Sequence, residues 1–372
     1  MARKKAEPKE ESLEPEGDYI DQLFTKVTED YGKGVLVDGD DVVNKEQVII
    51  PWSPCLDQIT GGGIQEGSWV GISGEPKTGK TTAALTFAAE AQQPEWAMLQ
   101  PDGSMKCRPI FYSKIEGRLS TEHLKDIKRL NIDKGSFFII QSCKGKILNA
   151  QQHLDILERV IKGIPGAVII IDSISTLCDE REATGGLGTE TRGGGAKLFS
   201  QFLRSNGQIV PINDTIVIGI THIINNTSGF GASRIEKGAN AWKYQKDYDV
   251  RPVKKEKWVA GKSVLGLRIE WICNTTPIGN PYQTIEGYLR WGVGIDRLFE
   301  AIQLGVTANL IVQSGCWFYM KYLEGKGMAK EEAPNLQGAE AVYHLLEEHP
   351  EWVRALENDL KGMTGLTISG GG

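Results

Sequence analysis

Residues 69–81 read WVGISGEPKTGKT, and this stretch decides how the rest of the chain is interpreted. The residues Gly74 to Thr81 fit the pattern GxxxxGK[ST], whose glycines let backbone N–H groups turn inward around phosphate oxygens. The sequence predicts an apolar strand over Trp69–Ser73 and an Ala- and Leu-rich helix over Thr81–Gln92, which is the context that this motif requires. We therefore interpret the stretch as a nucleotide phosphate loop rather than a Gly-rich turn with an incidental lysine.

The motif assigns roles to individual side chains. Lys80 is expected to reach the β- and γ-phosphates and to act in catalysis, and the Thr81 hydroxyl is expected to complete the coordination of Mg²⁺. The expected ATP contacts from this region are Gly74, Glu75, Pro76, Lys77, Thr78, Gly79, Lys80, Thr81 and Thr82.

A second buried strand, predicted over Val168–Asp172, ends in a carboxylate. At the carboxyl edge of a parallel sheet Asp172 would lie beside the phosphate loop and bind Mg²⁺ through water. Such a strand end alone is more often a simple polar turn, but with the phosphate loop it predicts a metal site of Thr81 and Asp172.

Hydrolysis also needs a group that orients or deprotonates the attacking water. Glu116 is the candidate, because it follows the strand Pro109–Lys114, which we expect to neighbour the phosphate-loop strand. His222 follows the strand Ile216–Thr221 and is the candidate sensor of the γ-phosphate, although a lone histidine is more often structural.

Short apolar runs alternate with helical segments, which is typical of a mostly parallel α/β sheet covered on both faces. Later strands, at Val264–Ile272 and Tyr288–Trp291, are expected to form an antiparallel edge. The expected parallel strands are Trp69–Ser73, Ile110–Ser113, Phe137–Gln141, Val168–Asp172 and Ile216–Thr221, and a helix with one apolar face is expected over Leu148–Ile161.

The chain divides by composition into five parts. We expect a disordered charged tail (1–17), an N-terminal helix and linker (18–45), an α/β ATPase core (46–296), a small C-terminal domain (297–361) and a flexible Gly-rich tail (362–372). The helix is predicted over Asp18–Asp30 and is stopped by Tyr31–Gly34.

Composition excludes several classes of protein. No long apolar run predicts a membrane span, and the first residues, MARKKAEPKEESLEPEG, lack the apolar stretch of a secretory signal. The cysteines form no CxxC pair, so a zinc site is not expected and they are interpreted as reduced thiols of a cytoplasmic protein.

The net charge of −6 argues mildly against a nucleic-acid binder. However, the segment from Phe230 to Lys262 holds nine Lys or Arg against four Asp or Glu. Such a run is usually a solvated face, and its position after a central strand favours binding here.

Further residues carry a family resemblance from about Asp18 to about Trp352, and their order and spacing make it specific. The residues concerned are the helix ending at Tyr31–Gly34, Trp52–Asp57 (WSPCLD) before Gly61–Gly63, Asn240–Tyr244 (NAWKY), Trp291–Ile295 (WGVGI), Leu304–Val306 (LGV) and Gly315–Tyr319 (GCWFY). The chain resembles the RecA recombinases, in particular a phage-encoded branch.

The resemblance implies a RecA-like P-loop ATPase core with an N-terminal polymerisation helix and a small α/β C-terminal domain. It implies a DNA-dependent ATPase that uses ATP and Mg²⁺, polymerises into helical filaments on single-stranded DNA, and pairs and exchanges strands with double-stranded DNA in recombination and repair. The implied setting is the cytoplasm of a bacterium or a phage-infected host, where single-strand-binding and loader proteins are possible partners.

The resemblance also assigns residues. Glu116 matches the catalytic glutamate, although the preceding strand is one residue longer here, and His222 matches the phosphate sensor, which is Gln in RecA proteins and His in some phage relatives. Trp291 and His123 match positions that stack on the base of ATP. The implied subunit interface contains Tyr31, Lys243 and Tyr244.

Two Gly-rich stretches, Glu180–Gly195 and Asn225–Ala241, match the family's DNA-binding loops. Both are long and lack a structural pattern, which is typical of functional or disordered loops. A cationic loop with an aromatic residue can bind phosphates and wedge between bases. The expected DNA contacts are Arg192, Gly193, Gly194, Phe230, Gly231, Arg234, Lys237 and Gly238.

The chain departs from the family at three positions. Cys273 and Thr275 match a pair of lysines that reach the ATP of the neighbouring subunit, and Ile224 replaces an arginine at the start of the second loop. We therefore expect hydrolysis to depend on another cation, either Arg268, a lysine within Lys254–Lys262, or bound metal ions.

Other classes remain open at this point. A hexameric helicase with the same core would form rings instead of filaments. A single-stranded-DNA coating protein switched by ATP would show little turnover. A small-molecule kinase would leave the basic segment and the second loop unexplained.

Overall fold

The structure is a computed structural model that describes residues 16–43, 47–99, 102–116, 119–179, 194–225, 234–238, 240–324, 326–361 and 363. The chain divides into a small unit, Met1–Gln47, and a large unit, Val48–Gly372.

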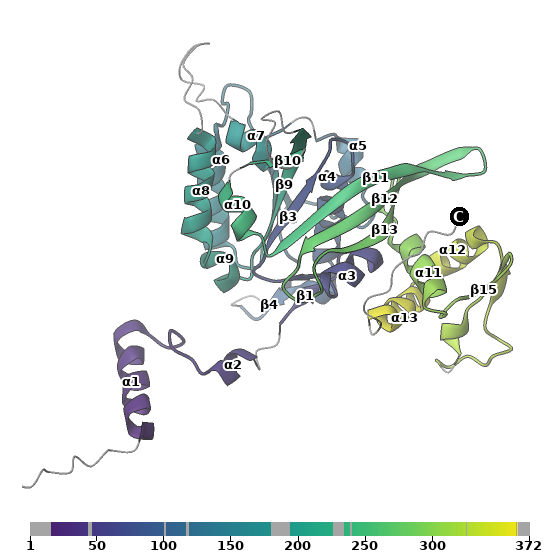
Figure 1. The fold of residues 1–372 in the computed structure, drawn as a ribbon, viewed down its shortest axis with the longest axis horizontal. Coiled ribbons are helices and arrows are strands. Elements are labelled where there is room, and N and C mark those ends of the chain that lie inside the picture. Colours follow the sequence, from purple (N-terminus) through teal and green to yellow (C-terminus); the bar gives the residue numbers. More distant parts are fainter. Residues whose placement is uncertain are drawn as a thin grey trace, which may run out of the picture. The chain divides into compact units, whose positions relative to one another are not determined.

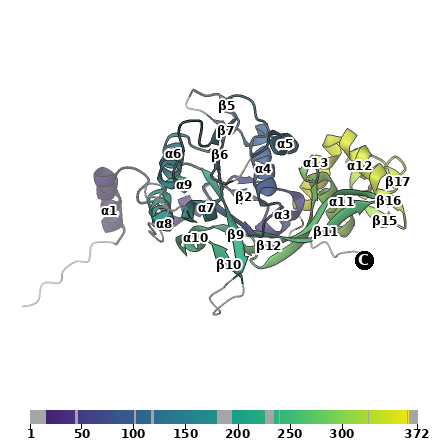
Figure 2. The same cartoon turned by 90° about the horizontal axis from the view of Figure 1, so that it is seen from above.

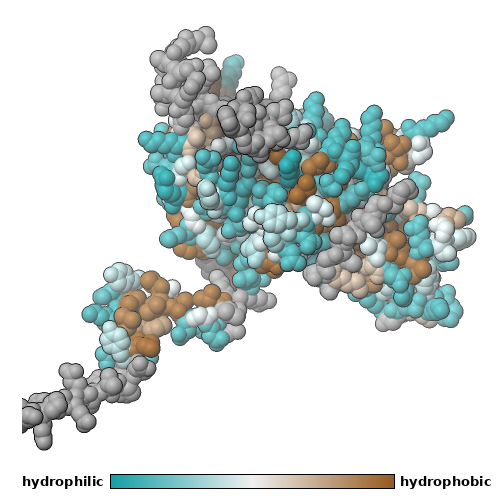
Figure 3. Space-filling view, in the orientation of Figure 1, coloured by the Kyte–Doolittle hydropathy of each residue, from teal (hydrophilic) through white to brown (hydrophobic). Residues whose placement is uncertain are grey.

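The small unit holds two helices, α1 (Glu16–Tyr31) and α2 (Gly39–Val43). The predicted N-terminal helix is present and begins at Glu16, so it includes the last residues of the segment 1–17. The Gly32 backbone N–H donates to the Thr28 carbonyl at 3.0 Å and closes α1 where Tyr31–Gly34 was expected to stop it. Apolar side chains of this unit, among them Ile20, Leu23 and Tyr31, are exposed (Figure 3).

The large unit is built on a twisted sheet of mixed direction (Figure 1). Its order is β14-β13-β12-β11-β3-β9-β8-β6-β7, and the pairs from β11 through β7 are parallel. The parallel strands are β3 (Trp69–Gly74), β6 (Ile110–Lys114), β7 (Phe137–Ile140), β8 (Val168–Asp172) and β9 (Ile216–Asn225). The prediction of an α/β core with a mostly parallel central sheet is confirmed.

Side chains of each central strand alternate between two buried clusters. Ile170 of β8 faces the cluster that contains α4 (Lys80–Ala91), whereas Ile169 and Ile171 face the cluster that contains α6 (Ala150–Gly163) and α8 (Gly194–Asn206). Because both faces are covered, these strands are apolar throughout, which explains their near-continuous hydrophobic runs. Figure 2 shows α6 and α8 grouped apart from α4.

One expectation about strand order is wrong. The strand before Glu116 is β6, and it pairs with β8 and β7, whereas β3 pairs with β9 and β11. The later strand β9 is inserted between β3 and β8. Apolar runs do not distinguish one central strand from another, so this insertion left no trace in the pattern.

The predicted antiparallel edge is confirmed and is larger than expected. It consists of β11 (Tyr248–Ala260), β12 (Ser263–Thr275), β13 (Gln283–Arg290) and β14 (Gly294–Ile295). The β11–β12 hairpin extends well beyond the neighbouring strands (Figure 1). Much of the basic run that ends at Lys262 therefore lies on a β-ribbon instead of in a loop.

The second predicted loop is also partly structured. β10 (Arg234–Lys237) pairs antiparallel with β9, so that Lys237 lies opposite His222, and α10 (Asn240–Gln245) follows. The expectation of an unpatterned stretch over Asn225–Ala241 is therefore wrong at both ends. Residues 226–233 and 239 lie outside the described residues.

Residues 297–361 pack into the same apolar cluster as the core. Helices α11 (Arg297–Thr307), α12 (Ala339–Glu348) and α13 (Pro350–Lys361) contribute Leu304, Leu346 and Leu356 to the cluster that also holds Leu56 of α3 (Pro54–Thr60). A three-stranded sheet of β15 (Val312–Ser314), β16 (Trp317–Tyr319) and β17 (Asn335–Gln337) completes this α/β segment.

The remaining elements are short connections around the core. They are β1 (Ile49–Ile50), β2 (Ile64–Gln65), η1 (Pro94–Trp96), β4 (Met98–Leu99), β5 (Met105–Lys106), α5 (Thr121–Lys125), α7 (Ile174–Asp179), α9 (Ile209–Ile212) and η2 (Lys321–Leu323). Among the described helices, none combines the length and apolar character of a membrane span.

A buried carboxyl joins the core to its C-terminal helices. Glu300 of α11 accepts hydrogen bonds from the backbone N–H of Cys55 at 3.2 Å and of Tyr288 at 3.3 Å. Burial raises the pKa of its carboxyl to about 7, although these hydrogen bonds and Arg297 oppose the rise. The folded state therefore binds a proton at Glu300 more tightly than the unfolded chain does.

This shift predicts a pH dependence of stability. The contribution is fully present below the unfolded pKa and is lost as pH rises through about 7, so the free energy of unfolding should fall between pH 5 and pH 8. Glu300→Gln should remove a part of that fall, up to about 3 kcal/mol, measured by urea unfolding. The exposed Glu340→Gln should leave the dependence unchanged, and an equal slope in the Glu300 variant and the parent would contradict the assignment.

Candidate nucleotide site

The phosphate loop leaves the end of β3 and leads into the N-terminus of α4. Gly79, the N-cap residue, has φ of 93° and supplies no side-chain cap, so the first N–H groups of α4 are not satisfied by a capping side chain. The positive φ favours glycine at this position, and a Cβ there would also displace the Leu289 side chain, whose Cδ1 atom lies 2.2 Å from the Cβ position. An uncapped helix N-terminus of this kind binds anions.

The Lys80 side chain is folded onto the loop itself. Its Nζ donates to the Gly74 carbonyl at 3.1 Å and to the Glu75 carbonyl at 2.7 Å. Burial lowers the pKa of the Lys80 ammonium group, and the nearby carboxylates of Asp172, Glu116 and Glu75 oppose this. The lysine thus lies inside the predicted phosphate-binding loop.

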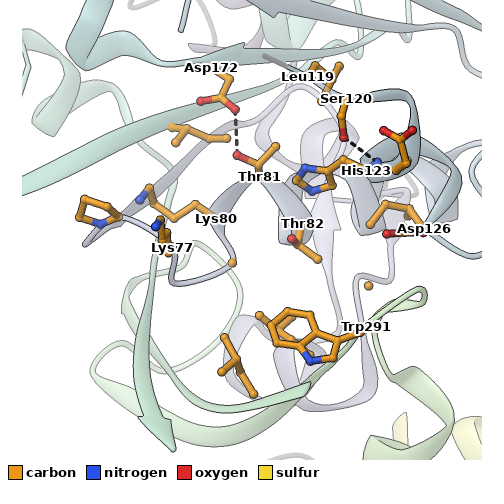
Figure 4. Close-up of a pocket in the computed structure, with 18 of the residues that line it drawn as sticks. Lys77, Lys80, Thr81, Thr82, Leu119, Ser120, His123, Asp126, Asp172 and Trp291 are labelled. Carbon is orange, nitrogen blue, oxygen red and sulfur yellow. Dashed lines mark hydrogen bonds between the residues drawn. The ribbon is translucent and has the colours of Figure 1, made fainter. Parts of the chain in front are cut away.

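Thr81 and Asp172 meet as predicted (Figure 4). The Thr81 hydroxyl donates to Asp172 Oδ2 at 2.8 Å, and the Tyr112 hydroxyl donates to the same oxygen at 2.6 Å. Burial, followed by the charge of Asp172, raises the pKa of Tyr112 well above its ordinary value, so this donor stays protonated.

These oxygens fit a magnesium ion. Mg²⁺ is commonly held by one or two carboxylates, waters and substrate phosphates instead of an all-protein cage. Among the described residues no group of three or more metal-binding side chains occurs, so Thr81 and Asp172 would hold the ion together with the phosphates.

Glu116 and His222 are in direct contact. His222 Nε2 lies 2.7 Å from Glu116 Oε2, and the hydroxyls of Ser173 and Thr176 donate to the same oxygen at 2.7 and 2.9 Å. Burial alone would raise the pKa of Glu116, but the hydrogen bonds from His222, Ser173 and Thr176 outweigh it and lower the pKa to about 2. Glu116 is therefore a carboxylate at neutral pH.

A cavity of about 620 Å³ joins these groups, a size within the range that holds small-molecule ligands. The predicted residues that line it are Pro76, Lys77, Gly79, Lys80, Thr81, Thr82, Glu116, His123, Asp172, His222 and Trp291.

His123 and Trp291 lie on either side of Thr82 in the view of Figure 4, away from Lys80. The Trp291 indole is 58% exposed, which leaves a ring face available for a base. Gly74, Glu75 and Thr78 are outside the lining; Gly74 and Glu75 accept from Lys80, and the Thr78 hydroxyl donates to the Glu75 carbonyl at 2.9 Å.

The predicted DNA contacts are only partly visible. Arg192, Gly193, Phe230 and Gly231 lie outside the described residues. Gly194 begins α8, the Arg234 backbone pairs with Asn225, and Lys237 and Gly238 follow at the base of the second loop. The DNA-binding roles of all these residues stay predictions.

The predicted interface residues are exposed. On α10 the Trp242 ring is buried, whereas Lys243 and Tyr244 point outward, with Tyr244 91% exposed. Tyr31 is exposed at the end of α1.

Cys273 and Thr275, which match the positions of the family's interface lysines, differ in their burial. Thr275 is exposed at the end of β12, but the Cys273 side chain is fully buried in the core, where burial raises the pKa of its thiol to about 12. A lysine at position 273 would place a charge in the core instead of at an interface. Arg268 is bound by Glu256 and Glu286, so it is not a free substitute.

Sequence reasoning missed three hydroxyl-bearing residues of the site. Tyr112 lies inside a strand, and Ser173 and Thr176 follow Asp172 without any motif. The only signal for Ser173 and Thr176 was their spacing of i and i+3 at the start of a helix, which places two side chains on one face.

Taken together, a phosphate loop after a central strand, a carboxylate at the end of β8 and a shared cavity define a P-loop ATPase fold. Residues 18–296 match the family model described as the RecA N-terminal domain. This match spans well over half of the chain, and the chain belongs to the RecA family.

Relatives align over nearly the whole chain. Protein RecA of Nitratiruptor sp. is 30% identical over 359 residues, which cover 94% of each chain. Protein RecA of Thermotoga neapolitana is 28% identical over 352 residues, 93% of each chain. Protein RecA of Geobacter metallireducens is 27% identical over 362 residues, 95% of this chain and 96% of that protein.

The positions of Lys80 and Glu116 allow their predicted roles, in phosphate binding and in water activation, to be tested separately. Lys80→Ala should abolish ATP binding, because it removes charge-assisted contacts to phosphates. Glu116→Gln keeps the shape and removes the base, so ATP should still bind while hydrolysis falls about 10²- to 10⁴-fold. Fluorescent nucleotide titration and phosphate release measure the two effects, and normal turnover in the Glu116 variant would show that another carboxylate acts.

Proposed function

We propose that the chain is a DNA-dependent ATPase that forms helical filaments on single-stranded DNA and catalyses homologous pairing and strand exchange in recombination and repair. The observation that carries the proposal is the single cavity in which Lys80, Thr81, Asp172, Glu116 and His222 meet. The names of the curated relatives, each Protein RecA, support the same activity.

Different side chains of the site would perform different parts of ATP hydrolysis. Lys80 and the N–H groups of α4 would hold the phosphates of ATP, and Thr81 with Asp172 would hold Mg²⁺, which offsets phosphate charge when bound. Glu116 would orient and accept a proton from the attacking water, and His222 would contact the terminal phosphate. Trp291 and His123 would stack on the base.

The positions of the predicted loops support coupling to DNA. α7 starts beside Glu116 and leads into residues 180–193, and β9 carries His222 and leads into residues 226–233. On the hairpin, Lys254, Lys257 and Lys262 are exposed and form no ion pair within the described part of the chain. These cations would face the phosphates of single- or double-stranded DNA.

Self-association is supported by apolar and aromatic side chains that are exposed among the described residues. α1 exposes an apolar stripe that includes Ile20 and Leu23, and α10 exposes Tyr244. β7 is an edge strand whose Phe138 and Ile139 are both 40% exposed, and an unpaired edge of this kind accepts another chain.

The histidine at position 222 leads us to place the protein in a phage-encoded branch of the family. It would then act in the cytoplasm of a bacterium or phage-infected host, alongside single-strand-binding and loader proteins. A second candidate, an ATP-switched coating protein with little turnover, is favoured by the buried Cys273, because the family's interface cations have no equivalent at that position.

The test combines turnover with filament imaging. Single-stranded DNA should stimulate ATP hydrolysis, and electron microscopy of the same samples should show helical filaments. Ile20→Ser with Leu23→Ser should abolish filaments and stimulation, because it removes the apolar stripe of α1, whereas ATP binding should persist. Rings would indicate a helicase, and filaments with almost no turnover would indicate the coating protein.

The salt dependence of DNA affinity tests separately whether the second loop contacts DNA. If Arg234 and Lys237 each neutralise one phosphate, replacing both by Ala should reduce the slope of log affinity against log salt by about 1.4. Lys144→Ala with Lys146→Ala removes the same charge from an exposed turn outside the loops and serves as the control. Equal slopes for the two double variants would show that Arg234 and Lys237 do not contact DNA phosphates and belong to a solvated face.

A further inference from the structure

The carboxylate of Glu116 is held by a pair of hydroxyls that no motif of the chain includes. Ser173 precedes α7 and Thr176 lies in its first turn. Both hydroxyls donate to Glu116 Oε2, at 2.7 and 2.9 Å, and His222 Nε2 lies 2.7 Å from the same atom. Three donors thus converge on one oxygen, and no hydrogen bond from the described residues reaches Oε1.

The number of lone pairs limits what this arrangement can do. A carboxylate oxygen offers about two acceptor sites, so three full hydrogen bonds to Oε2 exceed its capacity. One of the two hydroxyls can donate to the other instead of to Glu116, because Ser173 Oγ and Thr176 Oγ1 lie 3.1 Å apart. When His222 donates to Glu116, one hydroxyl can therefore turn toward its neighbour.

The hydrogen bonds around Glu116 Oε2 can also take a second arrangement. If His222 leaves Glu116 to contact a nucleotide phosphate, both hydroxyls can donate to Oε2 and fill its two acceptor sites. The carboxylate then keeps its position while its histidine partner changes. Among the described residues no donor reaches Oε1, so this oxygen can accept a hydrogen bond from water.

The hydroxyl pair is itself held rigidly. Ser173 is completely buried, and its Oγ accepts from the Thr176 backbone N–H at 3.3 Å. The Leu177 N–H donates to the Ser173 carbonyl at 3.1 Å, which fixes the first turn of α7, and Leu177 is buried. By contrast, the side chains of Glu116 and His222 are 44% and 23% exposed.

We propose that Thr176, together with Ser173, is a positioning residue that keeps Glu116 aimed at the attacking water when His222 turns to the nucleotide. Thr176 acts through Glu116 and touches neither the phosphate loop nor the metal-binding residues in the described contacts. This inference rests on the proposed ATPase function and adds a residue to its machinery.

The experiment replaces Thr176 with valine, which loses the hydroxyl and keeps the methyl group, and with alanine, which loses both. Thr176→Val and Thr176→Ala should lower kcat for DNA-stimulated ATP hydrolysis about tenfold, the effect of about 1.4 kcal/mol in the barrier, while KM for ATP changes less than about twofold. Thr176→Ser retains the hydroxyl and should keep nearly full turnover. In the nucleotide-free protein His222 still holds Glu116, so the melting temperature of these variants should stay close to that of the parent.

The matched control is Thr307→Val. It removes the same hydroxyl from α11, where that group donates to the Gln303 carbonyl at 3.0 Å and lies outside the cavity, and should leave kcat unchanged.

Each other outcome contradicts the proposal in a recognisable way. Normal kcat in both the Val and Ala variants, or a Ser variant as slow as the Val variant, would overturn the role of the hydroxyl. A raised KM with unchanged kcat would assign Thr176 to nucleotide binding instead. A parent protein without any DNA-stimulated turnover would overturn the proposed function and this inference together.

Discussion

The parallel register of the central strands is the constraint on which the site depends. Gly74 at the end of β3 lies opposite His222 of β9, and Lys114 at the end of β6 lies opposite Asp172 of β8. Because all four strands point the same way, every polar residue at or just beyond a strand end is delivered to one edge of the sheet. A slip of one residue would turn these side chains to the other face and separate the phosphate loop from Asp172.

The parallel strands could be predicted from the sequence, whereas their order could not. Strands buried on both faces read as continuous apolar runs, so β3, β6, β8 and β9 were visible. Their neighbours are chosen by packing between distant segments, and the insertion of β9 between β3 and β8 leaves no local pattern. β11 was missed for another reason: it leaves the core as a ribbon, and its run of Lys254 to Lys257 resembles a solvated loop.

The candidate site also contains some residues that could be predicted from the sequence and others that could not. Lys80, Thr81 and Asp172 could be predicted because phosphate and Mg²⁺ chemistry demands a small set of residue types at set spacings. The hydroxyls that hold the carboxylates could not, because serine, threonine and tyrosine occur everywhere and gain a role only from their surroundings. Tyr112 shows this most clearly: its ring belongs to the core, and only its hydroxyl reaches Asp172.

A net charge of −6 is compatible with a polyanion partner because the cations of the hairpin divide into two sets. Arg268 is bound by Glu256 and Glu286, and Lys255 by Glu270, so these cations stabilise the pairing of β11, β12 and β13. Lys254, Lys257 and Lys262 are left exposed on the same ribbon without an ion pair to any described residue. The acidic residues of the hairpin are thus used within the sheet, and the positive charge that remains is concentrated where the ribbon projects from the core. The overall charge of a chain therefore says less about its partners than the way its ion pairs are placed.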